Sequence, residues 1–153
     1  MSMGTSILVA LISFVAGVTV SVVAGRLSQR LKVSEFRQAW INSLREDIAS
    51  YLGITQRWFH AAKMEEEPGK LFAMGNEASV ILYRIKMRIN PNENKHKRED
   101  DEFIASLERI QTTGGLPAVG LETHWATAAA EITLLARKLL KREWDITKQF
   151  RWW

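Results

Sequence analysis

Residues 5–25 read TSILVALISFVAGVTVSVVAG, a run of 21 residues that contains no charged side chain. As a helix with a rise of 1.5 Å per residue, this run extends about 30 Å, the thickness of the hydrocarbon core of a bilayer. All Lys, Arg, Asp and Glu residues of the chain follow it. The sequence therefore predicts an extracytoplasmic tip and a membrane span in residues 1–25, and a water-facing domain in residues 26–153.

Positive charge lies on one side of the span only. No Lys or Arg precedes the span, and four basic residues follow it closely: Arg26, Arg30, Lys32 and Arg37. By the positive-inside rule, we expect the N-terminus outside, the span in the inner membrane and residues 26–153 in the cytoplasm. The basic flank would lie against anionic lipid headgroups. A cleaved signal peptide is the alternative, although its basic residues should precede the apolar core.

Small residues form a stripe along the span at intervals of three or four: Ser6, Ala10, Ser13, Gly17, Ser21 and Gly25. In lipid, helices associate where small residues allow the two backbones to approach closely. The stripe therefore predicts a helix–helix interface in a homo-oligomer. A second interpretation makes it the wall of a narrow pore in a ring of identical spans, since one span alone cannot enclose a channel. The alternative to both is coincidence in a segment rich in small residues.

Residues 26–153 carry apolar residues at the spacing of three or four that amphipathic helices show. We expect helices at about 27–63, 70–89, 100–112 and 120–150, with turns at 65–69, 90–92 and 114–117. Neither Gly nor Pro occurs between Gly25 and Gly53, so the span can continue into the first of these helices as a rigid stalk. The expected fold class is all-α, with one N-terminal transmembrane helix followed by a cytoplasmic four-helix bundle.

The same spacing predicts which side chains face the core of the bundle. They are Val33, Phe36, Trp40, Leu44, Ile48, Tyr51, Leu52 and Phe59 in the first helix, Leu71, Val80, Ile81, Tyr83, Ile85 and Met87 in the second, Phe103, Ile104, Leu107 and Ile110 in the third, and Trp125, Ala128, Ile132, Leu135, Leu139 and Ile146 in the fourth. Arg142 interrupts the last stripe, and Trp144 falls near a core position.

Basic residues gather on both sides of residues 90–94: Arg84, Arg88, Lys95, Lys97 and Arg98. Because Arg84 and Arg88 lie one helical turn apart, their guanidinium groups form a forked surface suited to phosphates. We expect an anionic ligand or a nucleic acid to bind there. The alternative is a solvated loop whose charge is neutralised by Asp100 and the two acidic residues after it. The basic face at 137–142 is the next candidate.

Motifs for catalysis or metal binding do not stand out. The chain has no cysteine, and its three histidines lie far apart in the sequence without the spacing of metal ligands. It has no glycine loop for nucleotides and no nucleophile arrangement. Seven residues separate Arg88 from His96, a longer gap than the helical HEPN nucleases usually have. We expect no enzymatic activity, no metal and no cofactor.

The stretch VSEFRQAWINSLREDIASYL at 33–52 and the closing LLKREWDITKQ at 139–149 resemble small single-pass membrane proteins of bacterial and phage genomes. The layout of one anchor and a basic helical domain is similar to the channel-forming subunit of the Hailong anti-phage defence system. That resemblance implies an oligomeric channel controlled by single-stranded DNA oligomers, which a partner nucleotidyltransferase makes. It carries over no individual residue.

The leading expectation is a homo-oligomeric membrane effector, an ion channel or pore whose cytoplasmic domain responds to a ligand or a soluble partner protein. A non-conducting membrane-anchored scaffold is one alternative, in which the small stripe only dimerises the anchor. A membrane-tethered nucleic-acid-binding protein is the other.

Overall fold

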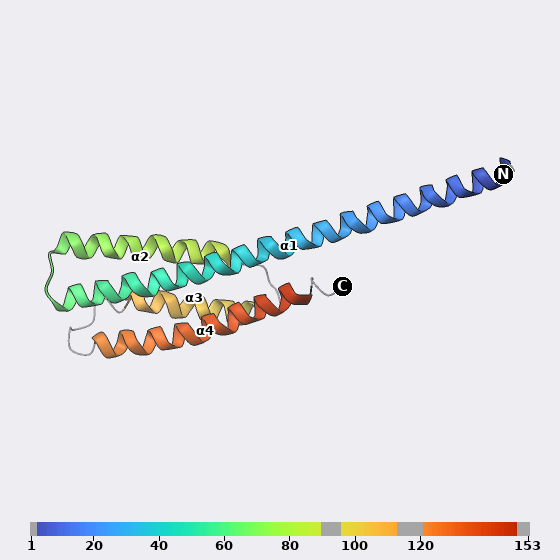
Figure 1. Cartoon of the computed structure of the whole chain (residues 1–153). Helices are drawn as coiled ribbons and strands as arrows, with labels where there is room; N and C mark the ends of the chain where they lie inside the picture. The colour runs from blue at the N-terminus through green and yellow to red at the C-terminus, as the bar shows by residue number, and fades with distance from the viewer. Residues whose placement is uncertain (1–2, 90–95, 113–120, 150–153) are drawn as a thin grey trace.

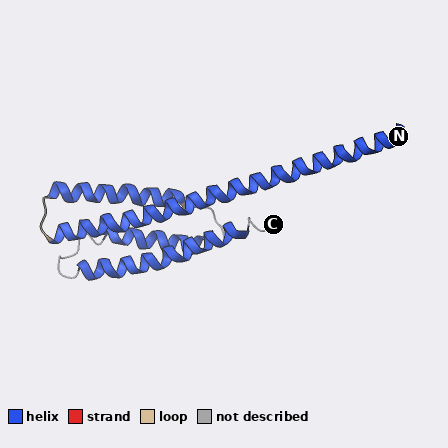
Figure 2. Cartoon of the chain, viewed as in Figure 1, coloured by secondary structure: helices blue, strands red, loops and turns tan. Residues whose placement is uncertain are grey.

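The computed structural model describes residues 3–89, 96–112 and 121–149, and within these residues all regular structure is helical (Figures 1 and 2). The helices are α1 (Met3–Lys63), α2 (Pro68–Arg88), α3 (Lys97–Thr112) and α4 (Leu121–Gln149). The all-α prediction is confirmed. The helices predicted at 70–89, 100–112 and 120–150 correspond to α2, α3 and α4, with ends that differ by up to three residues.

α1 is one unbroken helix of 61 residues that contains both the apolar run and the first helix of the bundle. At 1.5 Å per residue it is about 90 Å long. Its N-terminal half extends well beyond the other three helices (Figure 1). The helix continues because residues 26–52 contain neither Gly nor Pro, the two residues that most often interrupt a helix.

The C-terminal half of α1 packs with the other helices into a four-helix bundle. α1 contacts α2 and α4, and α3 lies between α4 and α2 on the opposite side. Successive helices are antiparallel, so that α1 and α3 run away from the apolar run while α2 and α4 return toward it (Figure 1). The C-terminal ends of α2 and α4 therefore lie at the end of the bundle nearer the apolar run, which we call the proximal end.

The core of the bundle is a continuous layer of apolar side chains from all four helices. Its most deeply buried members include Ile41, Leu44, Tyr51 and Ile54 of α1, Ile85 of α2, Phe103, Leu107 and Ile110 of α3, and Ile132 of α4. The Tyr51 hydroxyl donates a hydrogen bond of 2.8 Å to the carbonyl oxygen of Leu107. Burial and the nearby charge of Glu108 raise the pKa of Tyr51, so the phenol keeps the proton that this hydrogen bond needs.

Several residues predicted to face the core are exposed instead. Val33 and Phe36 precede Ile41, the first buried residue of α1, and Phe36 exposes 74% of its surface. On α2 the buried residues are Ala78, Ile81, Leu82 and Ile85. Val80, Tyr83 and Met87 share the outer face of α2 with Phe72 and are each more than 60% exposed. Apolar residues occupy both faces of α2, so their spacing alone did not show which face packs. Trp144 is also exposed.

Where its side chains are described, the apolar run of α1 is not covered by other parts of the protein. From Ile7 to Val23, the large apolar side chains that the structure describes expose 47–72% of their surface. By length and composition, α1 is long and apolar enough to cross a membrane.

Candidate functional site

The two arginines of the predicted anion site face a carboxylate of the protein itself. Arg88 Nε lies 2.7 Å from Oδ2 of Asp47, and Arg84 Nε lies 3.2 Å from Oδ1 of the same residue. Asp47 is on α1 and is buried to all but 7% of its surface. Trp40, also on α1, donates its indole N–H to the carbonyl oxygen of Arg88 at 3.2 Å. Together these contacts clamp the proximal end of α2 to α1.

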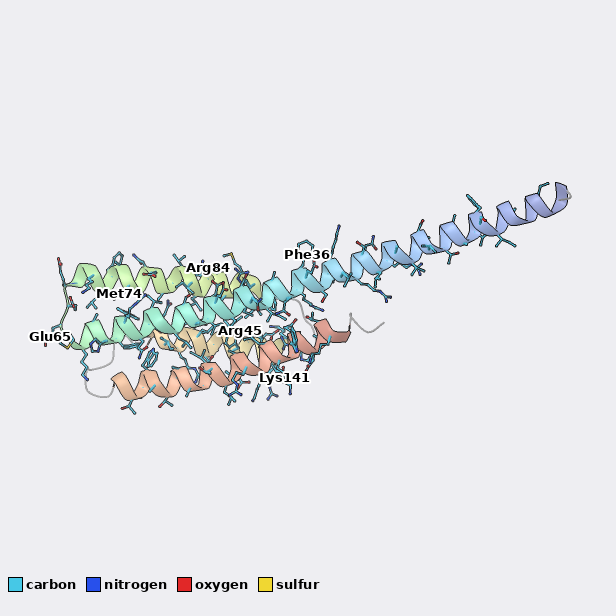
Figure 3. All side chains as sticks on the ribbon, in the orientation of Figure 1. Phe36, Arg45, Glu65, Met74, Arg84 and Lys141 are labelled. Atoms are coloured by element: carbon cyan, nitrogen blue, oxygen red, sulfur yellow. The ribbon has the colours of Figure 1, made fainter. Side chains whose placement is uncertain are left out.

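This geometry defines what the arginine pair can do. The predicted fork is present, because both guanidinium groups converge on one carboxylate. An external phosphate at this place has to compete with Asp47 for the same donors. Half of the Arg84 side chain is exposed and Figure 3 places it on the bundle surface, so it is the member of the pair that an external anion can reach. The role of this pair in ligand binding stays a prediction.

The other residues of the predicted anion site lie at the start of α3. Lys97 Nζ lies 2.8 Å from Oδ2 of Asp101, one turn further along the helix. Arg98 is exposed in the same turn. Lys95 lies outside the described residues. The neutralisation by neighbouring acids, which the sequence offered as the alternative, is thus present at Lys97.

A second clamp joins α4 to α3 at the proximal end. Arg142 of α4 bonds Asp100 Oδ1 at 2.8 Å and Glu99 Oε2 at 3.3 Å, both on α3. It also bonds Glu143 beside it at 3.2 Å. Burial lowers the pKa of Arg142, but the hydrogen bonds and charges of Asp100 and Glu143 outweigh this effect and raise it. The break in the apolar stripe at Arg142 is therefore a partly buried ion pair with the buried Asp100, and an arginine within the apolar stripe was its signal in the sequence.

The predicted interface residues Ser13, Gly17, Ser21 and Gly25 lie in the uncovered part of α1. Ser13, Gly17 and Ser21, with neighbouring apolar residues, line a shallow hollow of about 410 Å³. A Cβ atom added at Gly17 would meet nothing within 4 Å in this chain. The Ser21 hydroxyl donates to the Gly17 carbonyl oxygen at 2.9 Å. The side chains of Ser6 and Ala10, also predicted for this stripe, lie outside the described part of the chain.

A basic groove of about 860 Å³ lies between α1 and α4 on the outside of the bundle. Its lining includes four cations, Arg45 of α1 and Arg137, Lys138 and Lys141 of α4, and no acidic residue. Trp144 and Leu134 add apolar surface, and Lys148 Nζ lies 5.3 Å from the centroid of the Trp144 ring. Figure 3 shows Arg45 and Lys141 on these adjacent helices. The sequence pointed to residues 137–142, but it missed Arg45, which joins them only through the packing of α1 on α4.

Metal ligands do not gather in the described residues, where no three His, Asp or Glu side chains are placed to hold an ion. Comparison with protein-family models, with curated proteins and with solved structures finds no match for the chain.

The clamp at Asp47 predicts that charge reversal at Arg88 destabilises the bundle more than charge reversal at Arg98 does. Arg88→Glu places two carboxylates together at a partly buried site, and we expect it to lower the stability of the bundle by about 2 to 3 kcal/mol. Arg98→Glu makes the same change of charge at an exposed position and should cost no more than about 0.5 kcal/mol. Urea unfolding followed by circular dichroism in mild detergent measures both. Equal losses would contradict the clamp.

Proposed function

We propose that this protein is a homo-oligomeric membrane effector, in which residues 5–25 of α1 cross the inner membrane and the cytoplasmic bundle controls ion conduction by the assembled spans. The observation that carries the proposal is the unbroken course of α1 from the apolar run into the bundle. The resemblance to the channel subunit of the Hailong system suggests anti-phage defence as the setting.

The membrane placement is supported by the surface of the apolar run. In the part of the run that the structure describes, none of this surface is covered, and exposing it to water is unfavourable at about 25 cal/mol per Å². Lipid removes that cost, and an unbroken helix also satisfies the backbone hydrogen bonds that lipid cannot satisfy. The basic residues from Arg26 onward favour a cytoplasmic position for the bundle.

The stalk supports mechanical coupling between the bundle and the span. Residues 26–40 continue α1 between Gly25 and Ile41, the first buried residue, over about 24 Å. A continuous helix transmits a rotation or tilt, whereas a flexible linker absorbs it. Movement of the bundle on ligand binding would thus reach the residues within the membrane.

Ion conduction by this protein requires an oligomer, because one transmembrane helix cannot surround an ion path. The small residues around Gly17 offer the place where spans can approach most closely. The open space beside Gly17 in the single chain leaves room for a neighbouring helix.

A non-conducting scaffold is the second candidate, and the hydroxyl groups of the span favour it. Ser21 donates to Gly17 O at 2.9 Å, and Thr19 donates to Val15 O at 2.8 Å. Because both hydroxyl groups have a partner in their own helix, they need no water-filled path. Conductance of the purified protein in liposomes separates the two functions.

The proposed orientation can be tested by protease protection. Residues 26–153 should resist protease added to intact cells and be degraded in inverted inner-membrane vesicles, since only the latter expose the cytoplasmic side. An epitope tag at the C-terminus follows the digestion. Cleavage of the bundle in intact cells would reverse the orientation.

Gly17→Leu tests the helix contact in the membrane. A Cβ atom at this position meets nothing within 4 Å in its own chain, so the change is expected to act mainly on the contact with another copy. We expect a smaller oligomer mass in mild detergent, together with loss of ion flux in liposomes. Val15→Leu, on the opposite face of the helix, is the control and should leave both unchanged. An oligomer and a flux that survive Gly17→Leu would exclude this stripe as interface and pore wall.

Insertion of alanines between Leu31 and Lys32 tests the coupling through the stalk. Two alanines turn the bundle relative to the span by about 200°, while seven turn it by about 700° and so nearly restore its phase. Control by the bundle predicts altered ion flux with two alanines and near-normal flux with seven. If both insertions conduct as the unmodified protein does, the stalk is only a tether.

A further inference from the structure

The cations of the bundle are unevenly neutralised. Arg84 and Arg88 share Asp47, Lys86 bonds Glu108 at 2.7 Å, and Arg142 holds Asp100. For Arg137, Lys138 and Lys141, by contrast, the described residues provide no ion pair. Arg45 bonds only the amide oxygen of Asn42, at 3.2 Å, among described partners. Uncompensated positive charge is therefore concentrated in the basic groove between α1 and α4.

We propose that this groove binds a soluble nucleoside polyphosphate, with the phosphates on Arg45, Arg137, Lys138 and Lys141 and the base against Trp144. The proposal deepens the proposed function by naming the ligand class that the bundle senses. It rests on that function where the position of the membrane is used to exclude lipid headgroups and the acidic turn of a neighbouring copy.

The distance of the groove from the proposed membrane boundary argues against lipid headgroups as its occupant. Gln38 and Arg45 mark its extent on α1. With Gly25 at the membrane boundary, these residues lie about 20 to 30 Å beyond it. The headgroup layer on one side of a bilayer is only about 5 to 8 Å thick.

The same geometry excludes the acidic turn of a neighbouring copy. Residues 65–67 are three consecutive glutamates at the far end of the bundle. In a parallel copy in the same membrane this turn lies about 60 Å beyond Gly25. It is therefore too far from the membrane to reach the groove.

The arrangement of the cations favours a compact anion over a long strand. Arg137, Lys138 and Lys141 fall within little more than one helical turn, a length of about 6 Å along α4, and Arg45 faces them from α1. A di- or triphosphate matches this length, and charge-assisted hydrogen bonds to phosphate oxygens are among the strong ones. A bound nucleic-acid strand requires cations along several nucleotides.

Trp144 provides the second half of the site. It lies three residues beyond Lys141 in the groove wall and exposes 39% of its surface. Lys148 Nζ lies 5.3 Å from the centroid of the ring, so a base that stacks on this face takes the place of that ammonium group. Stacking on an aromatic side chain stabilises a bound base whatever its identity, because every base has a π-face.

Calorimetric titration of the full-length protein in phosphatidylcholine nanodiscs tests the proposal. The probes are ATP, inorganic tripolyphosphate and adenosine, without magnesium. We expect ATP and tripolyphosphate to bind and adenosine not to bind. Arg137→Glu with Lys141→Glu should weaken both interactions by about tenfold or more, which corresponds to at least about 1.4 kcal/mol. Trp144→Ala should weaken ATP and leave tripolyphosphate unchanged.

The matched control is Lys97→Glu with Arg98→Glu, which makes the same change of charge at the start of α3. It should leave ATP binding unchanged. If this variant weakened ATP binding and the groove variant did not, the site would lie on α3 and the proposal would be overturned. Tighter binding of a thymidine 15-mer or of oligoglutamate, lost in the groove variant, would assign the groove to a strand or an acidic peptide instead. A changed oligomer mass in the groove variant would make it a subunit interface. If ATP does not bind, the proposed ligand is wrong. The proposed function is not affected by that result, because topology and ion flux are measured without ATP.

Discussion

A helix that crosses lipid must satisfy every backbone hydrogen bond within itself, and the unbroken course of α1 fits this requirement. α1 meets it over the apolar run and then keeps the same geometry for another 38 residues, from Arg26 to Lys63. The remaining helices have no independent connection to the apolar run. Their positions depend on α1, which forms one side of the bundle and contacts both α2 and α4.

Two buried carboxylates at the proximal end hold this arrangement in register. Asp47 takes its arginines from α2, and Asp100 takes Arg142 from α4. Apolar side chains can exchange places along a helix at low cost, but a buried carboxylate without its cation is strongly unfavourable. The ion pairs therefore fix how far α2 and α4 slide along their neighbours. They lie at the end of the bundle where force from the stalk would enter.

The fold was largely predictable from residue spacing, whereas the sites depend on which helices meet. Phe103, Leu107 and Ile110 are buried as predicted, because α3 has only one apolar face. The prediction failed at Val80, Tyr83 and Met87, where a second apolar face on α2 gave the same periodicity. Arg84 and Arg88 could be placed on one helix face, but their partner Asp47 lies more than 35 residues away. Arg45 could be assigned to the basic groove only once α1 and α4 were known to be adjacent.

The length of α1 also affects how the protein is made. If α1 crosses a membrane as proposed, the apolar run leaves the ribosome and is inserted before the C-terminal helices have been made. Leu44 and Ile48 then lack α4, whose Ile132 and Leu139 complete their cluster last. During that interval the nascent chain presents an open apolar surface, the situation in which chaperones are needed. In the proposed topology, insertion therefore precedes closure of the bundle, and α1 serves as the template on which the later helices assemble.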